Sequence, residues 1–284
     1  KKQKQQKTEE STATATAEPH TSQPEQELNN YLAQQNQQKT EKVQIDTSPE
    51  FVNWLKTHNA SITFSTKSAS KIFCVGVTED DKLSLGERPF DRCGALAENH
   101  NSIYLSTSYQ IWRLENSIPA DQKFQGFDKF YIPQQSFVTG DLNIQDMWVD
   151  EQGRILFTNS LFSCLATVSS QSSFIPLWKP SFVSQINAEN RCHLSGVAVI
   201  DNQPKYVTVA GQTDTKQGWV ECRQNGGCVI DITTNNVVCS GLSIPQSPRY
   251  YQDKLYVLNS GTGHFGSINL ESNAFEPIAF MPGY

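Results

Sequence analysis

The chain has 284 residues, of which 18% are charged, and its formal net charge at pH 7 is −6. An acidic chain lacks the basic surface that neutralises nucleic-acid phosphates, so this charge argues against a nucleic-acid partner. No run of about 18 apolar residues occurs, which excludes a membrane-spanning helix. The low charge content, with abundant Ser, Thr, Asn and Gln, favours strands and turns over charge-patterned helices.

Residues 1–48 are rich in Gln, Lys, Glu and Thr and contain few aliphatic residues. Such a segment cannot bury enough apolar surface to offset its chain entropy, so we expect a low-complexity linker or tail. The chain begins without Met or an apolar leader, which predicts that it follows another module in a longer protein. The stretch FVNWLKTHN from Phe51 has the apolar spacing of a short amphipathic helix.

From Ser61 onward, short β-prone runs alternate with turn residues at close, even intervals. This pattern is typical of a sandwich, a barrel or a propeller, and internal repetition distinguishes the propeller. A layout of apolar strand, polar turn and further strands repeats from Gly94, Asp146, Gly196 and Ser247. With a first start near Ser61, the spacing averages about 45 residues, the size of one four-stranded blade.

We therefore predict an all-β fold, a β-propeller of four-stranded blades over residues 49–284, with about five blades. A β-sandwich is the alternative, and it does not explain the repeat. The chain stops at FMPGY, where the next inner strand is expected to start. Because a missing blade exposes sheet edges, we expect the domain to be truncated there and a sixth blade to follow Tyr284.

The seven cysteines are odd in number and contain no C-x-x-C pair. This spacing favours reduced, mostly buried thiols over a disulfide framework or a structural zinc site. The expected location is therefore cytoplasmic.

Eight segments resemble those of a family of conserved hypothetical bacterial proteins, frequent in cyanobacteria, known as a domain of unknown function. They are FDRCGALA from Phe90, QIWRLEN from Gln110, TGDLNIQD from Thr139, FTNSLFSCLATVS from Phe157, FIPLWKPSFVS from Phe174, ENRCHLSGVAV from Glu189, GLSIPQSPRYY from Gly241 and LNSGTGHFG from Leu258. The resemblance runs from about Phe51 to Tyr284 and implies a propeller that continues past PGY with a further unit. It implies no particular activity.

The layout is also distantly similar to the gluconolactonase-type six-bladed propellers, whose central mouth holds a divalent cation. The segment HLSGVAV occupies the place of an inner strand in that family. The histidines that the resemblance leads us to expect before Asp146 and after Pro245 are Gln145 and Gln246 here. This departure weakens the case for a metal ring.

In a propeller, the residues that precede the inner strands crowd around the axis at one mouth. We predict a ligand-binding set drawn from these positions. It comprises Arg92, Gln145, Asp146, His193, Ser195, Gln246 and Arg249.

Asp146 and His193 are the candidates for a divalent cation, although they are too few for a structural zinc site. His193 with Asp146 as its orienting carboxylate is a possible general base, with Ser195 or Cys192 as nucleophile. No nucleophile elbow accompanies them. The plainer interpretation is that His193 bonds the backbone of a neighbouring blade and that Cys192 fills the core.

Three arginines lie near these positions: Arg92, Arg191 and Arg249. Their guanidinium groups are suited to binding the carboxylate or phosphate of a ligand. The alternative is that they form ion pairs between blades, with Asp91, Asp146 or Glu189. The tryptophans at 112, 148, 178 and 219 fall once in each of four blades. We expect most of them in the core between blades, although one at the mouth would suit stacking on a sugar or peptide ring.

Three function classes remain open: a propeller that binds a peptide, a glycan or another small polar ligand, a metal-assisted hydrolase or lactonase, and a tailoring enzyme for a peptide or a surface polysaccharide. The missing histidines and the lack of a reactive constellation favour the binding propeller. The sequence identifies no catalytic residues for the two enzyme classes.

Overall fold

The computed structural model describes residues 45–281, so the predicted linker or tail lies almost wholly outside the described residues. The chain divides into two units after Pro49, and the second unit contains every strand given below. Within residues 45–281, no helix combines the length and the apolar character that a membrane crossing requires.

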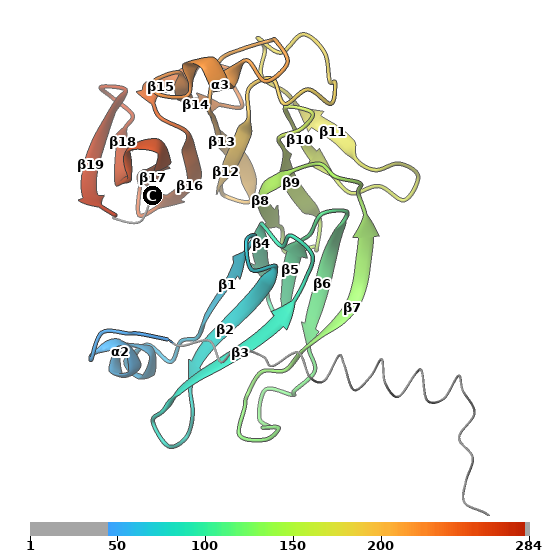
Figure 1. Ribbon diagram of the computed structural model, residues 1–284, viewed down its shortest axis with the longest axis vertical. Coiled ribbons are helices and arrows are strands. Elements are labelled where there is room, and N and C mark those ends of the chain that lie inside the picture. The colour runs from blue at the N-terminus through green and yellow to red at the C-terminus, as the bar shows by residue number, and fades with distance from the viewer. Residues whose placement is uncertain (1–44, 282–284) are drawn as a thin grey trace, which may run out of the picture. The chain divides into compact units, whose positions relative to one another are not determined.

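Five antiparallel sheets follow one another along the chain, and neighbours in each sheet are also neighbours in sequence (Figure 1). The first sheet has β1 (Ile62–Thr66), β2 (Lys71–Val77) and β3 (Leu83–Pro89), and the second has β4 (Leu96–Asn99), β5 (Ser102–Ser106), β6 (Gln110–Asn116) and β7 (Tyr131–Val138). The third has β8 (Ile144–Val149), β9 (Ile155–Asn159), β10 (Cys164–Thr167) and β11 (Ile175–Trp178). The fourth has β12 (Leu194–Ile200), β13 (Gln203–Val209), β14 (Gly227–Asp231) and β15 (Val237–Leu242), and the fifth has β16 (Pro245–Tyr251), β17 (Lys254–Asn259), β18 (His264–Asn269) and β19 (Ala274–Phe280). This layout confirms the predicted propeller with five blades and is not that of a sandwich.

The helical elements are short. Helix α2 (Phe51–Thr57) confirms the amphipathic helix expected from Phe51, and Leu55 is its buried residue. Helix α3 (Trp219–Cys222) lies between β13 and β14, and the 3-10 turn η1 (Ser260–Thr262) lies between β17 and β18.

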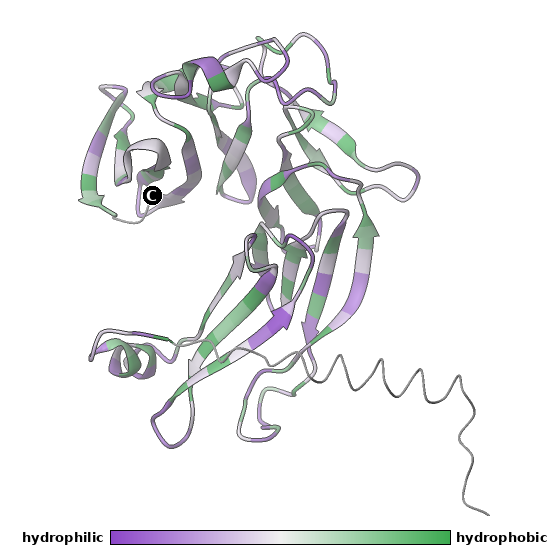
Figure 2. Ribbon diagram, viewed as in Figure 1, coloured by the Kyte–Doolittle hydropathy of each residue, from purple (hydrophilic) through white to green (hydrophobic). Residues whose placement is uncertain are grey.

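The core consists of apolar layers between successive sheets. In β9, Ile155 and Phe157 pack in the layer shared with the second sheet, whereas Leu156 packs in the layer shared with the fourth. Because successive side chains of a strand point to opposite faces, a strand between two blades is apolar on both faces. This explains continuous runs such as ILFTN, and hydrophobic colour accordingly covers much of the strands (Figure 2).

The first strands of four sheets form the inner layer, since β4 contacts β8, β8 contacts β12, and β12 contacts β16. The contact between β12 and β16 is very close. A side chain added at Gly196 would place its Cβ 2.2 Å from Cδ of Pro248 and 3.0 Å from the backbone nitrogen of Ser247. Glycine is therefore required at this point because no Cβ fits between the two strands.

The first sheet differs from the prediction because it has three strands, not four. Strand β1 ends close to the residues that precede β4. Ser65 Oγ donates a hydrogen bond to the carbonyl oxygen of Gly94 at 2.5 Å, and Cys93 Sγ donates one to the carbonyl oxygen of Thr66 at 3.5 Å. Strand β1 thus runs opposite to the inner strands and corresponds to the second strand of a regular blade. The expected inner-strand start near Ser61 was wrong by one strand.

Candidate ligand-binding site

The end of the sheets at which β4, β8, β12 and β16 begin is called here the N-terminal rim. In a meander, each second strand returns to the end where the first began, so the turns between second and third strands lie at this rim too. The β1–β2 turn belongs to the rim because β1 corresponds to a second strand. Helix α3 lies in the equivalent connection of the fourth sheet.

Lys67, in the β1–β2 turn, connects the first sheet to the third. Its Nζ donates a hydrogen bond to Oε1 of Gln145 at 3.0 Å, and Nε2 of Gln145 donates to Oδ1 of Asn143 at 2.7 Å. Lys67 is accessible to solvent, yet burial by the surrounding protein, followed by the charge of Arg92, lowers its pKa, while Asp141 acts in the opposite sense. An accessible but partly desolvated ammonium is typical of a binding site rather than of an open surface.

Arg92 and Asp141 lie beside Lys67 and neutralise each other. The guanidinium NH1 of Arg92 is 3.2 Å from Oδ2 of Asp141, and both side chains are about half exposed, at 57% and 44%. Exposed pairs of this kind contribute little to stability, so both side chains remain available to a ligand.

His193 precedes β12 with a backbone φ of +50°. Its Nδ1 is 3.2 Å from Nδ2 of Asn190, and its ring stacks on Trp219 with centroids 4.4 Å apart. With the Asn190 amide in this orientation, its N–H donates to Nδ1, and the imidazole proton is then on Nε2. Burial, and then the charge of Lys67, lowers the pKa of His193 to about 4, so the ring is neutral at pH 7.

We call Lys67, Arg92, Asp141, Asn143, Gln145 and His193 the Lys67 cluster. Several buried polar atoms at the same rim lack a hydrogen-bond partner among the described residues. They are Oγ1 of Thr66, Oγ of Ser108, Nδ2 of Asn159, Oδ1 of Asn190 and Nε1 of Trp219. Buried polar groups are rarely left unsatisfied, so this concentration indicates a place where water or a ligand completes the hydrogen bonding.

Asp146 and Arg249, two predicted site residues, bind each other, with Asp146 buried and the Arg249 side chain 54% exposed. The guanidinium of Arg249 donates to both carboxylate oxygens of Asp146, at 2.8 and 2.9 Å. The backbone N–H groups of Met147 and Val197 donate to the same carboxylate at 3.0 and 3.1 Å. This pair, called the Asp146–Arg249 pair, joins β8, β12 and β16, and it is the pairing between blades that was the alternative to ligand binding.

Ser195 and Cys192 lack the properties of nucleophiles. Oγ of Ser195 lies 2.5 Å from the carbonyl oxygen of Pro245 and 3.0 Å from Oγ1 of Thr208, and the side chain is buried. Burial raises the pKa of the Cys192 thiol to about 12, so no thiolate forms at neutral pH. Asp146 is committed to Arg249, and His193 contacts Asn190 and Trp219, so the suggested base and orienting carboxylate are engaged separately.

Gln246 and Arg191 complete the predicted positions. Gln246 is half-buried and pairs with Leu258 near the start of β16. Arg191 is buried and bonds Oε2 of Glu189 at 2.8 Å and Oδ1 of Asp214 at 2.6 Å, which makes it a structural residue. Among residues 45–281, no group of three or more His, Cys, Asp or Glu side chains is arranged to hold a metal ion.

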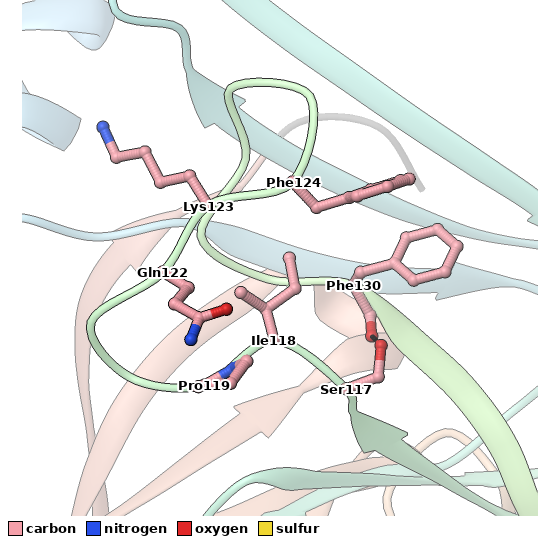
Figure 3. A pocket seen from close by; sticks show the side chains of 7 residues that line it. All are labelled: Ser117, Ile118, Pro119, Gln122, Lys123, Phe124 and Phe130. Atoms are coloured by element: carbon pink, nitrogen blue, oxygen red, sulfur yellow. Dashed lines mark hydrogen bonds between the residues drawn. The ribbon is translucent and has the colours of Figure 1, made fainter.

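A separate pocket of about 320 Å³ lies in the connection between β6 and β7, at the end of the second sheet away from the N-terminal rim. Figure 3 shows the rings of Phe124 and Phe130 next to each other, with centroids 5.7 Å apart, while Lys123 extends away from them. Ser117 Oγ donates to the carbonyl oxygen of Phe130 at 3.0 Å. The pocket contains none of the predicted site residues.

Sequence reasoning missed Lys67, Asn143 and the position of Trp219. Lys67 was missed because the first sheet was assigned one strand out of phase. Asn143 lies two residues before Gln145, within the segment TGDLNIQD, and its amide had no distinguishing pattern. Most of the four tryptophans were expected in the core and one at the mouth was left open, without saying which; α3 places Trp219 against His193 at the rim.

Residues 49–284 match the model of a protein family described as a domain of unknown function, DUF4915. No curated protein matches the chain by sequence. Among solved structures, virginiamycin B lyase from Staphylococcus aureus is 12% identical over 78% of this chain and 66% of the lyase, with a TM-score of 0.44. A streptogramin B lyase is 12% identical over 79% of this chain and 66% of its own, with a TM-score of 0.45.

A protein of unknown function from Bacteroides caccae is 12% identical over 76% of this chain and 71% of its own, with a TM-score of 0.47. The chain thus spans 66% of the length of the two lyases. These similarities concern the fold alone.

Proposed function

Because the chain belongs to the DUF4915 family, whose description assigns no activity, we propose from the geometry that this propeller binds a small polar ligand, such as a peptide or glycan end, at the N-terminal rim. The observation that carries the proposal is the Lys67 cluster. It joins an accessible ammonium and a neutral imidazole, and unsatisfied buried polar atoms lie at the same end of the sheets. Propellers bring such groups from separate blades to one mouth, where they bind ligands.

Binding is favoured over catalysis because the candidate reactive groups are poorly suited to reaction. The Cys192 thiol stays protonated, Ser195 is buried and hydrogen-bonded, and His193, with a pKa of about 4, is a weak base. The seven free cysteines, five of them buried, suit a reducing compartment such as the cytoplasm.

Glycan and peptide arrays probed with the parent protein test this proposal. We expect hits whose signal falls at least tenfold in Lys67→Met and is unchanged in Lys254→Met. The control removes the same charge from the first residue of β17, at the other end of the sheets. An absence of hits in the parent, or hits that are equally strong in both variants, would contradict binding at this rim.

A further inference from the structure

We propose that the ligand of the N-terminal rim carries an anionic group, a carboxylate or a phosphate, which Lys67 binds together with His193. This inference deepens the proposed function and depends on it. It rests on how the charges at the rim are paired and on the balance of hydrogen-bond donors and acceptors there.

The cations near the rim differ in their partners. Arg92, Arg191 and Arg249 each bind a carboxylate, at 3.2, 2.6 and 2.8 Å respectively. Lys67 instead donates to the neutral amide oxygen of Gln145, and among the described residues no carboxylate lies within ion-pairing distance of its Nζ. Within the Lys67 cluster, Lys67 therefore carries a positive charge without a bonded counter-ion.

Most of the unsatisfied polar atoms at the rim are able to donate a hydrogen bond, and among the five named above only Oδ1 of Asn190 is solely an acceptor. The contact with Asn190 leaves an N–H on Nε2 of His193, and Nε1 of Trp219 is a donor without a partner. The hydroxyls of Thr66 and Ser108 are also unsatisfied and are able to donate. A set of donors next to an ammonium suits the oxygens of a carboxylate or a phosphate, which accept several hydrogen bonds each.

The electrostatic environment agrees with this geometry. Burial and the charge of Arg92 lower the pKa of Lys67, and the charge of Lys67 contributes to the lowered pKa of His193. Both shifts indicate a locally positive, partly desolvated site, where a bound anion is stabilised more than it is in water. Asp141, which is paired with Arg92, is the negative group that opposes this effect.

NMR titration of the protein distinguishes an anion site from a general polar site. The probes are inorganic phosphate, acetate and the neutral acetamide, added at constant ionic strength, with the Trp219 indole N–H and the His193 ring as reporters. We expect saturable shifts with phosphate and acetate and none with acetamide. The apparent Kd should be at least tenfold weaker in Lys67→Met, largely restored in Lys67→Arg and unchanged in Lys254→Met.

Equal shifts with acetate and acetamide, or an unchanged Kd in Lys67→Met, would overturn the inference. So would the lack of a saturable shift with either anion. If neutral glycans or peptides from the arrays still shift the same resonances, the proposed function stands and only the anion preference fails. If neither those ligands nor the anions shift them, both proposals fail. Thermal melting of each variant confirms that it is folded, as expected for a change at an accessible side chain.

Discussion

The Asp146–Arg249 pair and the Lys67 cluster are both built from side chains of different blades, yet they differ in how their charges are satisfied. The carboxylate of Asp146 accepts four N–H bonds, two from Arg249 and two from the backbone. Lys67, in contrast, donates to a neutral amide, and buried polar atoms without partners lie at the same rim. Convergence at a propeller axis therefore does not by itself make a binding site, because converging groups that satisfy one another hold the blades together.

The largest expected effect on stability comes from removing the carboxylate of Asp146. Asp146→Ala leaves the Arg249 guanidinium and two backbone N–H groups without their acceptor. We expect the free energy of unfolding to fall by about 3 kcal/mol, measured by urea denaturation. Lys67→Met, at an accessible side chain, should change it by less than about 0.5 kcal/mol. Similar losses in the two variants would remove the distinction between the two regions.

A smaller loss is expected when the strands that carry the pair are forced apart. In Gly196→Ala, the new methyl group meets Pro248 and Ser247 of β16 and displaces Arg249 from Asp146. We expect a loss of about 2.5 kcal/mol in the same assay, typical of overpacking between rigid groups. If Gly196→Ala were as stable as the parent, the contact between β12 and β16 would be looser than described.

The lowered pKa of His193 at the rim should make the stability of the protein depend on pH. His193 has a pKa of about 4 in the folded protein, below its value of 6.5 in an unfolded chain, so the unfolded state binds more protons between these values. The contribution of His193 is therefore present above pH 6.5 and is lost as the pH falls toward 4. Between pH 7.5 and pH 5 this loss amounts to about 2 kcal/mol.

Comparing the pH dependence of unfolding in the parent and in His193→Gln isolates this contribution from that of the carboxylates. The variant should lose less stability than the parent over the same pH range. Parallel curves for the two proteins would mean that His193 titrates normally in the folded state and that its surroundings are more hydrated than the structure implies.

The blade pattern was predictable because each blade must bury both faces of its strands. Runs such as ILFTN and KLYVLN mark these strands, and the spacing of the repeats located β4, β8, β12 and β16. The convergence of Asp146 and Arg249 followed from that spacing. Their pairing with each other, as opposed to binding a ligand, depends on side-chain directions that a repeat spacing does not contain.

Two other features escaped prediction for separate physical reasons. The first sheet lacks an equivalent of β4, so counting repeats from Ser61 placed Lys67 away from the rim. Helix α3 interrupts the connection between β13 and β14, a local feature that the repeats do not share, and it brings Trp219 onto His193. The predicted roles in ligand binding of all seven residues remain predictions: Arg92, Gln145, Asp146, His193, Ser195, Gln246 and Arg249.

The most direct test of anion binding at Lys67 is to compare the melting temperature in phosphate with that in chloride at equal ionic strength. A ligand that binds only the folded protein raises its melting temperature. We predict that phosphate raises the melting temperature of the parent and of Lys254→Met but leaves that of Lys67→Met unchanged. An equal rise in all three proteins, or no rise in the parent, would contradict an anion site at the N-terminal rim.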